Sequence, residues 1–159
     1  MQKLFVLFFV FSFPTIQGAF SRGGGAQVTR SSNDVAKGEV ERVLLTQQEA
    51  WNRRDLEGFM AGYWNSPELT FFSGAKENNG WQATMDRYRA TYASPGHEMG
   101  KLTFSGLRIE MLGADAAFAR GSWQLTMSDG KTPHGLFTLV FRKFPEGWKI
   151  VHDHTSAAA

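Results

Sequence analysis

Residues 135–156 read GLFTLVFRKFPEGWKIVHDHTS, and this stretch decides the fold of the chain. Two runs rich in β-branched and aromatic residues flank the turn sequence PEG, which predicts two long antiparallel strands. The preceding segment, from Lys101 onward, alternates apolar and polar side chains and is divided by the turns GAD and SDGK. The C-terminal half is therefore predicted to be a meander of four long strands.

The segment before Lys101 predicts three helices and one short strand. The apolar face of the first helix consists of Val40, Val43, Leu44, Gln47, Ala50 and Trp51. A second helix is expected from Asp55, as N-cap, through Phe59 and Met60 to Tyr63. NSPELTFFSG predicts a turn and a short strand, and NNGW opens a third helix with Trp81, Met85, Tyr88 and Tyr92 at helical spacing. The predicted fold class is α+β, with three N-terminal helices packed on one face of a curved, mostly antiparallel sheet.

The N-terminus has the layout of a secretory signal peptide. Lys3 precedes an apolar run over residues 4–13, and small residues follow near Gly18 and Ala19, where cleavage is expected. The run is too short for a comfortable membrane span, so we expect no membrane contact after its removal. The expected organisation is a signal peptide at 1–18, a flexible linker at 19–36, one domain at 37–156 and a tail at 157–159. The expected location is secreted or periplasmic.

Composition excludes several classes of function. The 159 residues contain no cysteine, which rules out disulfides, a thiolate nucleophile and cysteine-ligated zinc. A net charge of +2 without a basic stripe argues against a nucleic-acid partner. No Gly-rich phosphate loop or nucleophile elbow is present, and we expect no cofactor.

Five segments carry a family resemblance. They read LLTQQEAWNRRDLEGFMAGYW, GWQATMDRY, MGKLTFSGLRIEML, AFARGSW and GLFTLVFRKFPEGWKIVHDHTS. Between Val40 and Ser156 the chain resembles the SnoaL-like branch of the nuclear transport factor two-like superfamily. This superfamily also contains ketosteroid isomerases, scytalone dehydratase, polyketide cyclases and the association domain of calcium/calmodulin-dependent kinase type II. The resemblance implies a cone-shaped fold, in which the sheet curls around a deep apolar pocket for a small molecule and its open face forms a homodimer. Function does not follow from this fold alone.

The last strand carries the candidate catalytic residues Asp153, His152 and His154. Regular alternation would place Trp148, Ile150, His152 and His154 on one face and Val151, Asp153 and Thr155 on the other. The three adjacent residues therefore cannot act as one triad. Likeness to the kinase association domain implies that the face of Asp153 looks into the pocket, together with Trp123, Leu139 and Phe141. A register error of one residue would exchange Asp153 for the histidines.

Two roles are open to Asp153 if its side chain faces the pocket. Aromatic neighbours would desolvate the carboxyl group, raise its pKa and suit it to general acid/base chemistry without a cofactor, helped by Tyr63 or a histidine. Alternatively, Asp153 would pair with Arg87 or with an indole N–H and simply anchor the strand. The base of the steroid isomerases has no counterpart, because SPELTFFSGAKENN contains no aspartate. Isomerase chemistry is therefore not carried over from the resemblance.

The other candidates concern a ligand and a metal. The residues expected to contact a ligand are Trp51, Tyr63, Trp64, Trp81, Tyr88, Trp123, Phe137, Leu139 and Phe141. His152 and His154 lie two apart, but a zinc site needs a third ligand, and nothing requires His97 or His134 to approach. We expect no metal. The leading interpretation is an exported small-molecule-binding domain with optional acid/base chemistry. The alternatives are an assembly module that uses the open sheet face and a cofactor-independent isomerase or lyase.

Overall fold

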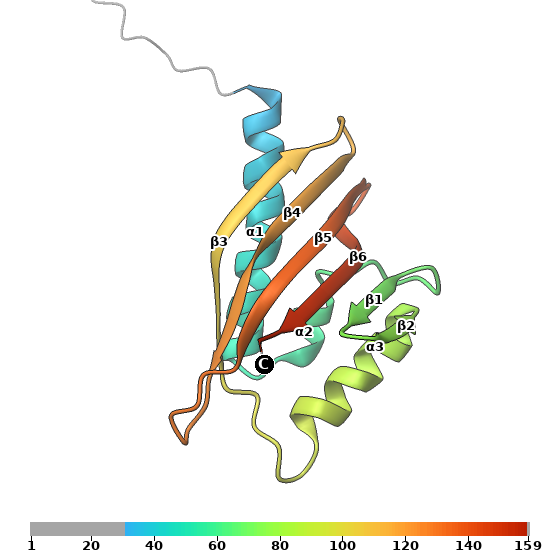
Figure 1. The fold of residues 1–159 in the computed structure, drawn as a ribbon. Helices are drawn as coiled ribbons and strands as arrows, with labels where there is room; N and C mark the ends of the chain where they lie inside the picture. The colour runs from blue at the N-terminus through green and yellow to red at the C-terminus, as the bar shows by residue number, and fades with distance from the viewer. Residues whose placement is uncertain (1–30, 159) are drawn as a thin grey trace, which may run out of the picture.

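The computed structural model describes residues 31–158. The expected signal peptide, and the linker as far as residue 30, lie outside the described residues. The three helices lie on one side of a curved sheet, as the sequence predicted (Figure 1). Their bounds are α1 (Ser32–Asn52), α2 (Leu56–Met60) and α3 (Trp81–Tyr88).

Helix α1 begins inside the segment that was expected to be linker. The Ser31 hydroxyl accepts a hydrogen bond from the Asp34 backbone N–H at 3.1 Å, and the Asp34 carboxylate accepts from the Ser31 backbone N–H in return. This reciprocal capping box stabilises the first turn at Ser32, ahead of the apolar periodicity that begins at Val40. The capping signal extends the ordered domain toward the N-terminus.

The two later helices are shorter than predicted. Helix α2 ends at Met60, and Tyr63 instead forms a parallel bridge with Ile150 of the last strand. Helix α3 ends at Tyr88 and continues as a π-helical turn, η1 (Arg89–Ala93). Tyr63 is therefore held by the sheet and not by a helix.

The sheet has six strands in the order β2-β1-β6-β5-β4-β3. The four long strands form the predicted antiparallel meander, and β1 joins β6 in parallel. Their bounds are β1 (Thr70–Ser73), β2 (Lys76–Asn79), β3 (Lys101–Met111), β4 (Ala116–Thr126), β5 (His134–Phe144) and β6 (Gly147–Ala157). Strand β2 was not predicted, because KENN is polar and lacks alternation. It forms because the chain reverses at Gly74, whose φ of 59° suits glycine.

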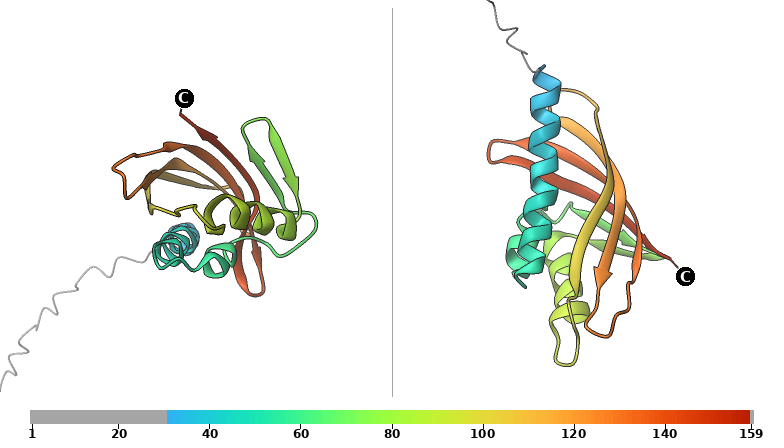
Figure 2. Two further views of the ribbon diagram at one scale, coloured as in Figure 1. Left: turned by 90° about the horizontal axis from the view of Figure 1, so that it is seen from below. Right: turned by 90° about the vertical axis from the view of Figure 1, so that its left-hand side faces the viewer.

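The sheet curls around the helices (Figure 2). Its pairing is interrupted at two places: in β3 between Ser105 and Arg108, and in the β5–β6 ladder next to Val140. Irregularities of this kind bend a strand and increase its twist. The concave face packs against α1 and buries a core that includes Leu44, Ile150 and Phe141.

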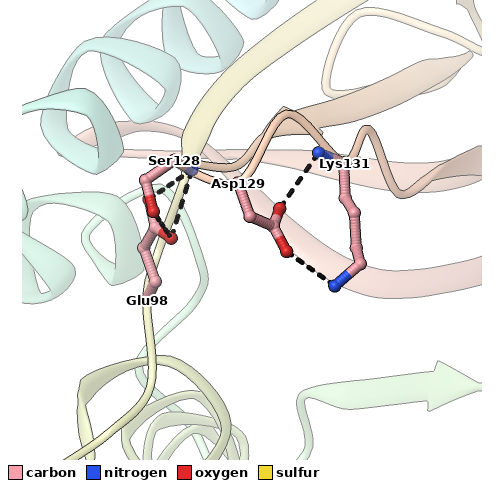
Figure 3. A network of polar contacts seen from close by, with 4 residues as sticks. All are labelled: Glu98, Ser128, Asp129 and Lys131. Atoms are coloured by element: carbon pink, nitrogen blue, oxygen red, sulfur yellow. Dashed lines mark hydrogen bonds and ion pairs between the residues drawn. The ribbon is translucent and has the colours of Figure 1, made fainter.

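A polar network fixes the loop that leads into β3. Glu98 accepts hydrogen bonds from the backbone N–H and the hydroxyl of Ser128 at 3.0 and 2.8 Å (Figure 3). In the same turn, between β4 and β5, Asp129 pairs with the Lys131 ammonium group at 2.6 Å. The loop before β3 is thereby tied to the neighbouring turn between β4 and β5. None of the helices in the described part of the chain is long and apolar enough to cross a membrane.

Candidate functional site

A bulge in β6 sets which side chains reach the interior. Ile150 pairs with Phe141 and His152 pairs with Val140, which leaves Val151 without a partner in β5. Trp148, Ile150 and Asp153 are consequently all buried, with 4%, 0% and 5% of their surfaces exposed. The prediction that Trp148 and Ile150 share a face with the histidines is wrong, because the extra residue shifts the alternation. Asp153 points inward, as the resemblance implied.

Asp153 lies on the wall of a cavity of about 180 Å³ between the sheet and the helices. An apolar cavity of about 150 Å³ is large enough to bind benzene. The space therefore suits one ring with short substituents. Among the residues expected to contact a ligand, those on the wall are Trp51, Tyr63, Tyr88, Trp123, Phe137 and Leu139.

Five other candidates lie away from the wall: Trp64, Trp81, Phe141, His152 and His154. The Trp64 ring stacks on Phe144 with centroids 5.3 Å apart, and the Trp81 indole donates to the Met60 carbonyl at 3.1 Å. Phe141 is fully buried in the core. Periodicity placed these aromatic side chains on the inner side of their elements, but it does not distinguish core from cavity wall.

Sequence reasoning missed several wall residues as ligand contacts, namely Phe59, Phe71, Arg87, Tyr92 and Phe104. Tyr92 was assigned to the apolar face of the third helix, and that spacing was a usable signal. Phe71 is placed by the pairing of β1 with β6, where it lies beside Asp153. A parallel contact between strands so distant in sequence leaves no local pattern.

Tyr63 is the hydrogen-bond partner of Asp153. Its hydroxyl donates to Oδ2 at 2.7 Å, whereas Oδ1 is buried and has no partner among the described residues. Burial raises the pKa of Asp153 to about 7, and the hydrogen bond from Tyr63 opposes this rise. The anchoring partners considered from sequence, Arg87 or an indole, are replaced by a phenol. The carboxyl group can exchange a proton near neutral pH.

A second phenol extends this contact. The Tyr88 and Tyr63 oxygens are 3.4 Å apart. Since the hydrogen of Tyr63 is directed to Asp153, the Tyr63 oxygen is left to accept from Tyr88. Burial, followed by the nearby Asp153 charge, raises the pKa of both phenols well above the ordinary value. Both stay neutral donors, aligned toward the carboxyl group.

The indole N–H groups of the two tryptophans on the cavity wall are already engaged. The Trp51 indole donates to the Met99 carbonyl at 3.1 Å, and the Trp123 indole donates to the Ser156 carbonyl at 3.1 Å. These rings therefore offer apolar surface to a ligand. Polar groups of other wall residues, such as the carboxyl group of Asp153, are left for polar recognition.

The two histidines lie on the outer face of the sheet. His152 Nδ1 is 2.6 Å from the Thr70 hydroxyl, and the Phe72 ring meets the His152 ring edge-on at 5.0 Å. Burial, and then the charge of His154, lowers the pKa of His152. Within residues 31–158, no three His, Asp or Glu side chains gather in a metal-binding arrangement.

Comparison with known proteins identifies the relatives of this chain. The family model described as SnoaL-like domain matches residues 40–159. A solved NTF-2-like protein of unknown function from Shewanella oneidensis is 38% identical, with a TM-score of 0.70 over 75% of this chain and 97% of that chain. Two more distant structures show the fold alone. No functionally curated protein matches the sequence.

The first of the two more distant structures is an NTF2-like superfamily protein from Salmonella enterica. It is 24% identical, with a TM-score of 0.67 over 80% of this chain and 94% of that chain. The second is described as a putative calcium/calmodulin-dependent protein kinase type II association domain from Thiobacillus denitrificans. It is 22% identical, with a TM-score of 0.63 over 75% of this chain and 94% of that chain.

Proposed function

Because the chain belongs to the SnoaL-like domain family, we propose that its aromatic cavity binds a small apolar or aromatic molecule beside Asp153. One observation carries this proposal: Asp153 lines the cavity, and its buried Oδ1 has no hydrogen-bond partner among the described residues. An unsatisfied buried oxygen costs on the order of 1–3 kcal/mol. A ligand that supplies a hydrogen bond recovers this cost.

The same carboxyl group supports acid/base chemistry on the bound molecule. A pKa of about 7 lets Asp153 donate or accept a proton at neutral pH. Isomerisation, dehydration and cyclisation require only such transfers in a site shielded from water. A strict isomerase or lyase is therefore a special case of this proposal, with Asp153 as the proton-exchanging group.

Native mass spectrometry of the protein from its own host tests the binding. Leu139 pairs with Asp153 across the β5–β6 ladder and lies on the cavity wall, so Leu139→Phe fills part of the cavity. Leu136→Phe on the same strand is the matched control, because Leu136 is 63% exposed. We expect a co-purified small molecule in the wild type and the control, and its loss in the cavity variant. An adduct that survives in Leu139→Phe, or is missing from the wild type, would contradict the proposal.

The same spectra separate binding from catalysis. Asp153→Asn keeps the shape of the side chain but removes its titratable proton. If Asp153 acts on the ligand, this variant retains an unconverted molecule that differs in structure from the one in the wild type, as fragmentation of the released molecule would show. Identical molecules in the two proteins would indicate a carrier and not an enzyme.

We also propose that the protein is exported. The support is the apolar run between Lys3 and Pro14 and the small residues at Gly18 and Ala19. The intact mass of the protein recovered outside the cytoplasm tests this, and we expect it to lack the first 18 or 19 residues. A full-length mass in the cytoplasmic fraction would refute export.

Self-association through the outer sheet face is a second candidate function. This face presents Phe72, Phe118, Leu136, Val140, His152 and His154, with Leu136 63% exposed. Exposed apolar surface on a sheet favours contact with a second copy. Sedimentation equilibrium should show a dimer that Leu136→Glu dissociates. Leu45→Glu on α1, where the leucine is 44% exposed, is the control that should leave the dimer intact.

A further inference from the structure

Arg87 is the charged group on the cavity wall that the proposed function does not use. It lies in the last turn of α3, is partly buried, and places its guanidinium carbon 5.5 Å from the centroid of the Phe71 ring. An aromatic face holds a guanidinium group by cation–π attraction without neutralising its charge. The hydrogen-bonding fork of Arg87 is therefore left for another partner.

No carboxylate in the described part of the chain forms an ion pair with Arg87. The contrast with Arg89, two residues later, is direct. Arg89 contacts Glu57 at 3.3 Å and Asp86 at 3.8 Å, and it is absent from the cavity wall. Arg89 is thus ion-paired outside the cavity, whereas Arg87 lines the cavity and has no ion-pair partner among the described residues.

Arg87 and Asp153 form no ion pair among the described residues, and the hydrogen-bond partner of Asp153 is Tyr63. Burial raises the pKa of Asp153, and the hydrogen bond from Tyr63 is the influence that lowers it. The charge of Arg87 acts instead on Tyr88 and Tyr92, where it opposes the rise in pKa that burial causes. The cavity therefore has a cation at one place and a carboxyl group with a free oxygen at another, joined by aromatic surface.

We propose that the ligand is a single-ring aromatic carboxylate whose carboxylate binds Arg87 and whose hydroxyl or carbonyl substituent binds Oδ1 of Asp153. This rests on the proposed small-molecule function and names the class of molecule. Guanidinium groups bind carboxylates through two parallel hydrogen bonds, which gives both strength and orientation. The cavity volume of about 180 Å³ fits a ligand body of one ring. A cationic amine fits less well, because Arg87 repels it and protonated Asp153 offers no charge.

Three matched probes test the class: 4-hydroxybenzoate, phenol and 4-hydroxybenzylamine, titrated calorimetrically into the full chain at pH 6 and low salt. The probes share a phenol and differ in the charge of the second substituent. We expect 4-hydroxybenzoate to bind at least about tenfold more tightly than phenol, as a charge-assisted pair implies. The amine should bind most weakly.

Two arginine variants test whether Arg87 causes the preference for 4-hydroxybenzoate over phenol. Arg87→Met keeps an apolar stem and should abolish the preference for 4-hydroxybenzoate while leaving phenol binding unchanged. Arg89→Met is the matched control and should leave both affinities unchanged. Circular dichroism of both variants establishes that they are folded. Asp153→Asn should alter the binding of phenol and of 4-hydroxybenzoate alike, since the hydroxyl group of each depends on Oδ1.

The outcomes distinguish the two proposals. Equal affinity for phenol and 4-hydroxybenzoate, or a preference that persists in Arg87→Met, overturns the assignment of an aromatic carboxylate but leaves a ligand-binding cavity. Preference for the amine also overturns it. If none of the three probes binds the wild type, this inference fails. An absent co-purified molecule in native mass spectrometry would be needed to refute the cavity function itself.

Discussion

The hydroxyl of Tyr63 donates a 2.7 Å hydrogen bond to Oδ2 of Asp153, across 90 positions of the chain. This contact joins the segment after α2 to the last strand. It satisfies one carboxyl oxygen, while the other has no hydrogen-bond partner among the described residues of this cavity-lining side chain. One phenol thereby both holds the acid in place and leaves it able to meet a ligand.

Removing the carboxyl group should change how stability depends on pH. The pKa of Asp153 rises from 3.8 to about 7 on folding, so between those values the folded protein holds a proton that the unfolded chain has released. Stability then falls as pH rises through this window, by up to about 1.4 kcal/mol per pH unit. Asp153→Asn should lack this component. Urea unfolding at pH 4.5, 6 and 8 measures it, and parallel curves for the two proteins would contradict the assignment.

Tyr63→Phe should raise the pKa of Asp153 further. The hydrogen bond from Tyr63 stabilises the ionised carboxylate, and its loss favours the protonated form. Carbon-13 NMR of labelled aspartate carboxyl groups follows this titration directly. Tyr92→Phe is the control, because Tyr92 lines the cavity but makes no hydrogen bond to Asp153 in the described structure. An unchanged or lowered midpoint in Tyr63→Phe would show that the hydrogen bond is not what tunes the acid.

Gly135→Ala should destabilise the domain by about 1–3 kcal/mol. A Cβ at this position would collide with the Ser156 carbonyl and lie 2.9 Å from the Trp123 indole nitrogen. These two groups are hydrogen-bonded to each other, so the substitution would also disturb their contact. Gly38→Ala is the matched control. A Cβ added at this position in α1 would have nothing within 4 Å. We therefore expect Gly38→Ala to stabilise the domain by about 1 kcal/mol, because alanine has the higher helix propensity. Equal stability of the two variants in urea unfolding would refute the steric argument.

The three helices and the four-strand meander could be predicted from the sequence. The helical spacing around Leu44 and the alternation around Ile109 are repeated signals that packing reinforces. Strand β2 was missed because its residues carry no apolar pattern and pair only after the chain reverses at Gly74. The start of α1 was missed because its signal is the cap at Ser31 and not the periodicity.

The candidate site was less accessible from sequence. Asp153 could be placed inside through the family resemblance, whereas regular alternation placed Ile150 on the wrong face. Nothing in the local sequence marks Val151 as the unpaired residue, since a bulge depends on pairing with β5. Trp81 was expected to contact a ligand because its ring lies on the apolar face of the third helix. Its hydrogen bond to Met60 emerges only from the packing of α3 against the end of α2.

The bulge at Val151 also bears on how this strand tolerates changes of length during evolution. Deleting Val151 would leave each remaining partner in the β5–β6 ladder where it is, with Ile150 opposite Phe141 and His152 opposite Val140. The strand would straighten, but the acid would still face inward. A deletion between Asp153 and the strand end would instead reverse the faces of everything beyond it. Val151 is thus a position at which one residue can be lost while Asp153 still faces the cavity.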